Sequence, residues 1–234
     1  MTNPPDEQNP VLSPKMEKME ELNSPQSRNS ELTLALVESA FLASTSSLIW
    51  LVNYYFPPGP LLRFFCALPI ALSYLRWGPR TAWMTFVVTG LLLTVLMGPT
   101  RSILFLMPYG LLGVQLGFMW RRRANWELSI GIGSILGSLG FFFNIWLVSI
   151  LLGEDLWLYS TVQVTNLLDW VFLRLGLLIE PSITLVQAIA IVMVWLNNLI
   201  YLFVVHLIAS LLLQKLGNPI PAPPSWVEVM LEEE

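Results

Sequence analysis

The sequence predicts an all-α membrane protein, a bundle of six transmembrane helices with an outer amphipathic segment. Composition is the first reason, because 55% of the 234 residues are hydrophobic and only 12% are charged, whereas soluble domains carry about 25% charged residues. The second reason is a series of apolar runs long enough to cross the ~30 Å hydrocarbon core of a bilayer. Turns rich in glycine and proline separate these runs, so the chain is expected to cross the membrane repeatedly.

The first apolar run follows a long polar stretch. Residues 1–30 are rich in proline and charge, which predicts a disordered cytoplasmic tail, since such sequences bury too little apolar surface to fold. The run at residues 31–56 has no small-residue cleavage site, so we expect a retained first membrane helix rather than a signal peptide. The Pro-Pro-Gly-Pro sequence at residues 57–60 ends this helix, because proline cannot donate a helical hydrogen bond.

Three further membrane helices are predicted, separated by Gly-Pro turns. They cover residues 61–77, 81–97 and 101–120. The first of them is short and carries Arg63 near its start. The third contains Pro108, which frees a backbone carbonyl in the middle of the helix.

A fifth membrane helix is expected over residues 126–153. No charged residue follows Glu127 within this range, and small residues recur at every fourth position, at Ser129, Gly133 and Gly137. Faces of this kind allow the backbones of neighbouring membrane helices to approach closely. We therefore expect this helix at the centre of the bundle.

The last third of the chain contains one ambiguous segment and one long helix. Residues 154–180 mix apolar side chains with polar and charged ones, which favours an amphipathic segment lying on the outer membrane surface. A seventh crossing or a re-entrant hairpin is the alternative. Residues 182–216 form a helix longer than one span requires, and residues 217–234 form a Pro-rich, acidic cytoplasmic tail. The membrane domain accordingly covers residues 31–216.

The positions of lysine and arginine predict the orientation of the bundle. Six crossings with a cytoplasmic N-terminus place nine of these residues inside and three outside, as the positive-inside rule favours. The inner residues are Lys15, Lys18, Arg28, Arg76, Arg80, Arg121, Arg122, Arg123 and Lys215, and the outer residues are Arg63, Arg101 and Arg174. Both termini are therefore expected in the cytoplasm.

Several polar and aromatic residues converge on the outer half of the predicted bundle. Together they could line an outward-facing pocket for a small anionic or amphipathic molecule, since arginine binds anions and amides add hydrogen bonds. The candidate ligand-binding residues are Asn53, Arg63, Arg101, Asn144, Trp195, Asn198 and Tyr201. The alternative is that the arginines extend to the membrane surface and the aromatic residues form an interfacial belt.

The first helix carries small residues at every fourth position. Ala35, Ser39 and Ala43 form a stripe that predicts close docking of another helix, which could belong to this chain or to a partner. Glu38 lies within the stripe and could exchange a proton, contact a partner or pair with an inner arginine. His206, the single histidine, is expected to hydrogen-bond to a neighbouring helix rather than to bind a metal, which needs several ligands.

Motifs for catalysis are missing from the sequence. It contains no Gly-Lys-Ser/Thr phosphate-binding loop, no His-Glu-x-x-His sequence and no Gly-x-Ser-x-Gly sequence. Cys66 is the single cysteine, and no histidine and cysteine residues have metal-ligand spacing. Basic patches with interleaved aromatic residues are absent as well. We therefore expect no enzymatic activity, no cofactor, no metal site and no binding of nucleic acid.

Two sequence stretches carry a family resemblance. These are ALPIALSYLRWGPRTAW at residues 67–83 and LMPYGLLGVQLGFMWRRR at residues 106–123, followed by the glycine-rich fifth helix. They resemble the YybS-like family of uncharacterised bacterial membrane proteins, in a cyanobacterial or plastid style. That family is similar in layout to the substrate-binding S components of energy-coupling-factor transporters.

The resemblance implies a role in transport. S components have six helices and cytoplasmic termini, and they capture a vitamin or a metal from outside. They dock through an Ala-x-x-x-Ala surface to a transmembrane coupling protein that carries two ABC-type ATPases. Ala35, Ser39 and Ala43 are similar to that surface, with serine in place of one alanine. The implied location is a bacterial plasma membrane or a thylakoid membrane, and the ligand is left open.

Two other functions fit the same sequence. A membrane scaffold or assembly factor would use the small-residue stripe and the two tails to bind other membrane proteins. A proton-coupled carrier would use Glu38 and His206 as relay groups, although no inverted repeat is evident between the two halves of the chain.

Overall fold

The computed structural model describes residues 25–56, 59–174, 176, 182–218, 220, 221, 223 and 224. The chain divides into two units, residues 1–38 and 39–234. In the first unit the described residues are the beginning of helix α2 (Pro25–Tyr55). This helix starts earlier than predicted, with Pro25 at a first position where its missing N–H costs nothing. The rest of the predicted N-terminal tail, the turn at Pro57 and Pro58, and most of the acidic C-terminal tail lie outside the described residues.

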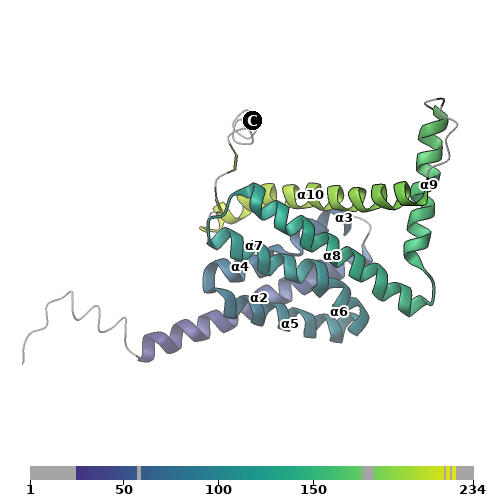
Figure 1. Cartoon of the computed structure of the whole chain (residues 1–234). Coiled ribbons are helices and arrows are strands. Elements are labelled where there is room, and N and C mark those ends of the chain that lie inside the picture. Colours follow the sequence, from purple (N-terminus) through teal and green to yellow (C-terminus); the bar gives the residue numbers. More distant parts are fainter. Residues whose placement is uncertain are drawn as a thin grey trace, which may run out of the picture. The chain divides into compact units, whose positions relative to one another are not determined.

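Every regular element in the described part of the second unit is helical (Figure 1). After the remainder of α2, these elements are α3 (Gly59–Leu62), the 3-10 helix η1 (Arg63–Phe65), α4 (Leu68–Trp77), α5 (Pro79–Met97), α6 (Pro99–Phe105), the π-helical turn η2 (Leu106–Gly110), α7 (Leu111–Arg121), α8 (Trp126–Leu152), α9 (Leu156–Arg174) and α10 (Ile183–Lys215).

Five helices in the described residues are long and apolar enough to cross a membrane, against six predicted crossings. They are Asn29–Tyr55, Pro79–Met97, Pro99–Arg121, Trp126–Leu152 and Ile183–Lys215. The chain is therefore a multi-pass helical membrane protein.

The prediction of one continuous helix over residues 61–77 is wrong, because this stretch is divided into α3, η1 and α4. Pro69 explains the division, because it lacks an amide hydrogen and lies in the first turn of α4, where none is needed.

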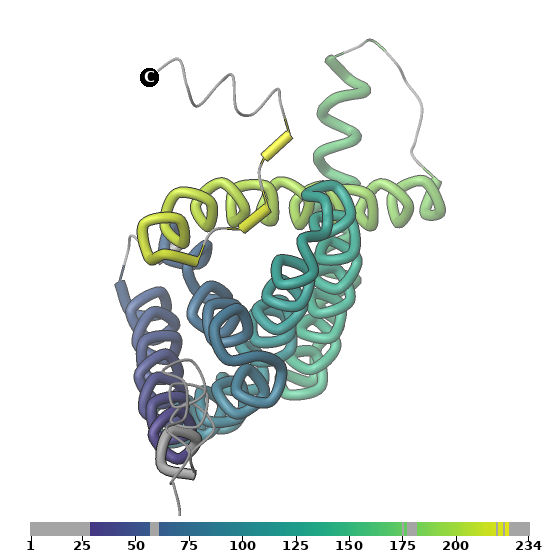
Figure 2. Tube along the Cα trace, turned by 90° about the vertical axis from the view of Figure 1, so that its left-hand side faces the viewer, coloured from purple at the N-terminus to yellow at the C-terminus, as the bar shows by residue number. Residues whose placement is uncertain are grey.

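The short helix α4 is buried against α7. Its residues from Leu68 to Tyr74 are all buried, and Figure 2 shows α4 in blue next to the teal helices. The two helices approach closely because α7 carries glycines at the contact. A Cβ at Gly113 would lie 2.7 Å from the Ala67 carbonyl oxygen, and one at Gly117 would lie 2.3 Å from the Tyr74 Cβ.

Helices α8 and α10 also pack through small residues, and Figures 1 and 2 show them side by side. The face predicted from Ser129, Gly133 and Gly137 is buried. A Cβ at Gly133 would lie 2.8 Å from the Leu202 side chain. The small residues of α8 therefore allow close packing against α10 of the same chain.

Helix α9 accounts for most of the segment that the sequence left ambiguous. It runs crosswise to α10 at the end where α10 begins (Figure 1), and it is not among the helices apolar enough to cross a membrane. Exposed apolar residues such as Trp170 alternate with exposed polar residues such as Asp169. This mixed composition fits an amphipathic helix, and its position on the membrane surface stays a prediction.

Candidate functional site

A cavity of about 410 Å³ lies between the start of the α3–η1–α4 segment and helices α8 and α10. Its lining residues are Leu61, Arg63, Phe64, Pro108, Tyr109, Leu112, Gly137, Phe141, Asn144, Asn197, Asn198, Ile200 and Tyr201. Among these described residues none is acidic, so Arg63 gives the cavity a positive charge.

Two tyrosines from different helices hold Arg63. Its Nε donates a hydrogen bond to the Tyr109 hydroxyl, and the Tyr201 hydroxyl donates to the Arg63 carbonyl oxygen at 3.0 Å. The guanidinium carbon lies 5.5 Å from the ring centre of Tyr109 and 6.0 Å from that of Tyr201, within the range of cation–π attraction. These contacts fix the side chain and leave the two terminal nitrogens of Arg63 available to a ligand.

Tyr109 reaches the cavity from a π-helical turn. Pro108 has no amide hydrogen to give to an α-helix, and the chain widens at Leu106–Gly110. Turns of this kind occur frequently at functional sites. Helix α8 packs directly on the turn, because a Cβ at Gly140 would lie 3.0 Å from the Pro108 Cα.

Two asparagines contribute amides to the cavity wall. Asn144 Nδ2 donates to the Leu104 carbonyl oxygen at 3.3 Å, while its Oδ1 is buried and has no hydrogen-bond partner among the described residues. Asn198 Nδ2 donates to the Val194 carbonyl oxygen at 2.9 Å. Gly137 provides the space for the Asn198 amide, since a Cβ there would lie 2.6 Å from Oδ1. An unsatisfied buried acceptor is costly, but the Asn144 oxygen is closed off from solvent, so it belongs to the cavity wall and is not an open contact for a ligand.

The structure brings together four of the seven predicted ligand-binding residues and places three elsewhere. Arg63, Asn144, Asn198 and Tyr201 line the cavity. Arg101 lies over the Tyr54 ring at 4.1 Å and donates to the Tyr55 hydroxyl at 3.3 Å. Asn53 and Trp195 lie on α2 and α10 and are not among the lining residues. Arg174, the third arginine predicted on the outer side, stacks on Trp170 in α9 at 5.5 Å.

Sequence reasoning missed Tyr109 as a lining residue. The signal that could have found it is Pro108, because a proline inside a membrane helix redirects its neighbours. Asn197, the neighbour of Asn198 in the chain, is exposed and also lines the cavity.

A family model described as "Predicted membrane protein (DUF2232)" matches residues 44–233, which is most of the chain. The protein belongs to the DUF2232 family. No curated protein and no solved structure matches it.

His206 of this DUF2232 protein is enclosed between α8 and α10. Its Nε2 lies 3.0 Å from the Ser129 Oγ and its Nδ1 lies 2.8 Å from the Leu202 carbonyl oxygen. The rings of Trp120 and Trp126 stand 5.4 Å and 5.3 Å from the imidazole. The predicted hydrogen bond between neighbouring helices is present, and both ring nitrogens are occupied within the protein.

Part of the small-residue stripe on α2 is buried in the DUF2232 chain itself. Ser39 and Ala43 are buried, and beyond them the Ser46 hydroxyl donates to the Cys66 carbonyl oxygen at 3.0 Å. Ser47 Oγ lies 3.4 Å from the Thr89 carbonyl oxygen on α5. Ala35, the third residue of the stripe, belongs to the first unit.

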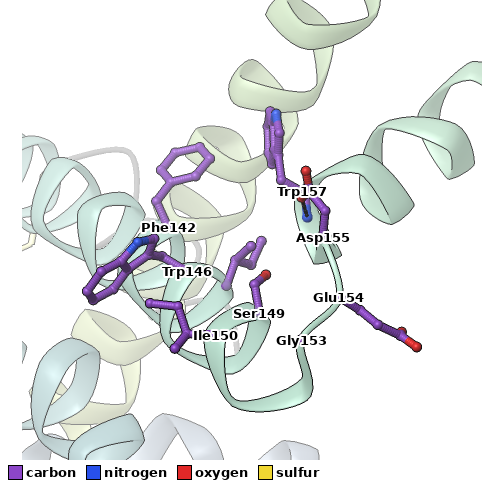
Figure 3. A pocket seen from close by; sticks show the side chains of 9 residues that line it. Phe142, Trp146, Ser149, Ile150, Gly153, Glu154, Asp155 and Trp157 are labelled. Atoms are coloured by element: carbon purple, nitrogen blue, oxygen red, sulfur yellow. Dashed lines mark hydrogen bonds between the residues drawn. The ribbon is translucent and has the colours of Figure 1, made fainter.

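A larger and more open cavity, of about 600 Å³, lies at the corner between α8 and α9 (Figure 3). Its polar groups are engaged in ending one helix and beginning the next. Asp155 Oδ1 accepts from the Trp157 and Leu158 amides at 3.0 Å, and Ser149 Oγ accepts from the Leu156 amide at 3.1 Å. Figure 3 shows the Glu154 side chain pointing away from the other lining residues. This corner is therefore structural, and the cavity around Arg63 is the better candidate site.

Proposed function

We propose that this DUF2232 protein is a non-enzymatic membrane protein that captures a small molecule, as the substrate-binding subunit of an energy-coupled transporter. The observation that carries the proposal is the cavity in which two tyrosines hold Arg63 while its terminal nitrogens make no hydrogen bond among the described residues. A cation that is held by aromatic side chains and keeps free donors at a cavity suits ligand binding, whereas an arginine serving only as an interfacial anchor needs no partner within the protein.

The chemistry of the cavity suggests the class of ligand. Its volume of about 410 Å³ lies within the range of about 300–1,000 Å³ typical of small-molecule pockets. The free nitrogens of Arg63 suit a carboxylate or another small anion. Phe64 and Tyr201 stack with ring centres 5.4 Å apart on one wall. The expected ligand is a small amphipathic anion with a planar apolar part.

The proposed topology has six crossings, with the α3–η1–α4 segment as the second. Irregular backbone is tolerated at membrane depth when it is buried in protein, and the buried surface of α4 supports this role. Six crossings place both termini and the Arg121–Arg123 cluster in the cytoplasm. Arg63, fourteen positions before the α4 end at Trp77, then lies toward the outer side, where it can receive a ligand.

Energy for transport would come from a partner, because the sequence has no nucleotide-binding motif. We expect a transmembrane coupling protein with ABC-type ATPases. Ser39 and Ala43 are already buried in this chain, so their part of the predicted docking surface would serve a partner only indirectly. Phe41 and Leu48 are exposed on the same helix and offer the more accessible contact.

Purification of the full-length protein from native membranes tests both parts of the proposal. Co-purification of a coupling protein and ABC-type ATPases is the expected result, and recovery of one large membrane complex without ATPases would contradict it. That second result would favour a scaffold or assembly factor, for which the exposed apolar residues of α9 offer a surface.

Native mass spectrometry of the same sample tests the cavity directly. The wild-type protein should retain a small molecule, and Arg63→Gln should lose it. Arg101→Gln is the matched control, because Arg101 is also held by tyrosines but lies outside the cavity. Equal retention by all three proteins would exclude Arg63 from the binding site.

A proton-coupled carrier is the least supported alternative. His206 has both ring nitrogens in contacts within the protein and two tryptophans around it. Uptake by reconstituted vesicles without ATP would nevertheless favour such a carrier over a subunit.

A further inference from the structure

A third cavity, of about 560 Å³, lies where α7 and α10 end, beside the last turn of α4. Among the described residues that line it, Arg121 and Arg123 are charged and none is acidic. The other lining residues are Leu75, Trp120, Gly217, Asn218, Ile220 and Pro221. This cavity shares no lining residue with the one around Arg63.

Arg123 adopts a backbone conformation that arginine rarely takes. Its φ is 53°, and among the described residues it alone combines a positive φ with a side chain other than that of glycine. The Arg123 amide donates to the Trp120 carbonyl oxygen and the Ala124 amide donates to the Met119 carbonyl oxygen, both at 3.0 Å. This pair of bonds is a Schellman motif, in which the left-handed position normally holds glycine because a Cβ crowds the backbone there.

The other side of the cavity shows the ordinary form of the same motif. α10 ends with Gly217 at a φ of 74°. The Gly217 amide donates to the Gln214 carbonyl oxygen at 3.1 Å, and the Asn218 amide donates to the Leu213 carbonyl oxygen at 2.9 Å. Two equivalent helix ends therefore border one cavity, and α7 carries a guanidinium where α10 carries glycine. Termination of α7 does not account for Arg123, since glycine would end the helix with less strain.

The neighbouring arginines have roles within the fold. Arg121 Nη1 donates to the Tyr74 carbonyl oxygen at 3.0 Å, and the Arg122 guanidinium lies 4.3 Å from the ring centre of Phe118. In the described part of the chain no hydrogen bond or ion pair involves the Arg123 side chain. The indole N–H of Trp120 is buried and has no hydrogen-bond acceptor among the described residues.

The charge of this region favours an anion. The C-terminal ends of α7 and α10 each contribute a partial negative charge of about half an electron. Arg121, Arg122 and Arg123 outweigh these two contributions, so the local charge remains positive. A requirement for positive charge on one side of the membrane could be met by a lysine or arginine anywhere in the loop, and it does not explain an arginine in a left-handed conformation.

We infer that this cavity binds a phosphate group, with Arg123 as the principal cation and Arg121 as the second. Guanidinium groups present paired N–H donors that match two phosphate oxygens. The position at the end of membrane helices suits the headgroup of an anionic lipid, and a soluble phosphate compound offers the same chemistry. The strain at Arg123 is retained because the bound phosphate requires its side chain.

Binding is tested on the full-length protein, stripped of lipid in neutral detergent, by native mass spectrometry with two probes. These are dioleoyl phosphatidic acid and inorganic pyrophosphate. Arg123→Gln should weaken binding about tenfold, the usual effect of losing one charge-assisted hydrogen bond. Arg122→Gln is the matched control, because it removes the same charge from the same loop and should change binding less than about twofold.

Arg123→Gly separates the binding role from a structural one. Glycine relieves the strained backbone, so thermal unfolding should shift upward by about 2–4 °C, while phosphate binding is lost. Binding of phosphatidic acid alone would identify a lipid site, and binding of pyrophosphate would identify a soluble phosphate ligand. The inference is overturned if neither probe binds the wild-type protein, if Arg122→Gln and Arg123→Gln have equal effects, or if Arg123→Gly binds as the wild type does.

Discussion

At the scale of single residues, the side chains around each arginine determine the role that its guanidinium group can have. Arg63 and Arg101 both lie near the predicted outer surface and both contact tyrosines. Arg63 meets Tyr109 and Tyr201 at the edge of a cavity, whereas Arg101, which is less exposed than Arg63, meets Tyr54 and Tyr55 outside that cavity. Under the proposed function, the first arrangement prepares a cation for a ligand and the second anchors the protein at the membrane surface.

Removal of one tyrosine hydroxyl should distinguish the arginine proposed to bind a ligand from the arginine proposed to anchor the protein. Tyr109→Phe keeps the aromatic ring beside Arg63 but removes the acceptor for its Nε, so the guanidinium loses its fixed position. We expect about fivefold or greater loss of the small molecule retained in native mass spectrometry, from the cost of one charged hydrogen bond. Tyr55→Phe removes the corresponding hydroxyl beside Arg101 and should leave retention unchanged. Equal retention by both variants would argue against fixation of Arg63 by Tyr109.

At the scale of elements, glycines determine which helices can approach one another. Gly113 and Gly117 of α7 face α4, while Gly133 and Gly137 of α8 face Leu202 and Asn198 of α10. Gly131 lies on α8 as well, but a Cβ there meets no atom within 4 Å. The same substitution should therefore have opposite effects at different positions along the bundle.

Gly117→Ala should destabilise the protein. Its Cβ would lie 2.3 Å from the Tyr74 Cβ and 2.9 Å from the Ala71 carbonyl oxygen, neither of which a side-chain rotation can move away. Overpacking of this kind costs about 1–3 kcal/mol. Gly131→Ala should instead stabilise the protein by up to about 1 kcal/mol, because alanine is the better helix former. Thermal unfolding in one detergent compares the two variants, and an equal or higher midpoint for Gly117→Ala would contradict the close α4–α7 contact.

At the scale of the whole molecule, the number of crossings decides which side of the membrane each end occupies. Five long helices and a buried, divided second segment leave two topologies, which differ in whether residues 59–77 cross the bilayer. Six crossings place the N-terminus on the same side as the Arg121–Arg123 cluster, and five crossings place it on the opposite side.

Cysteine labelling distinguishes these topologies. Cys66 is buried and is the single cysteine, so Cys66→Ala provides a background without reactive thiols. Ser13→Cys and Asn125→Cys should react with a membrane-impermeant maleimide from the same side, and Asp155→Cys should react from the other. Labelling of Ser13→Cys from the side of Asp155→Cys would establish five crossings and remove the argument for an outward-facing cavity.

The sequence predicted the long helices well because their signal is local. Continuous apolar runs and the Gly-Pro turns between them are properties of neighbouring residues, as for α5 and α8. The division of residues 61–77 was not predicted, because a run of sufficient apolarity does not reveal that Pro69 lies in the first turn of a new helix. Whether six crossings form remains a prediction.

The composition of the cavity was harder to predict because it depends on contacts between distant segments. Arg63 and Tyr201 are separated by 138 positions, and nothing in the sequence pairs them in preference to Arg101 or Trp195. In the sequence, no local feature distinguishes Tyr109 from the other aromatic residues of its glycine-rich helix. Its role depends on the wider turn at Pro108, which is a property of the backbone rather than of composition.

That wider turn also changes which directions a single helix can face. An α-helix advances by about 100° per residue, so each additional residue accommodated in a turn rotates all later side chains by about that amount around the axis. The span Pro99–Arg121 therefore has two angular phases, one before Leu106–Gly110 and one after it. Its first part can direct Ser102 toward α5, where it bonds the Gly90 carbonyl oxygen at 2.6 Å. Its second part can direct glycines toward α4. Deletion of Met107 would remove the angular offset between the two parts of the span. Either the side chains that face α5 or those that face α4 would then turn away from that helix.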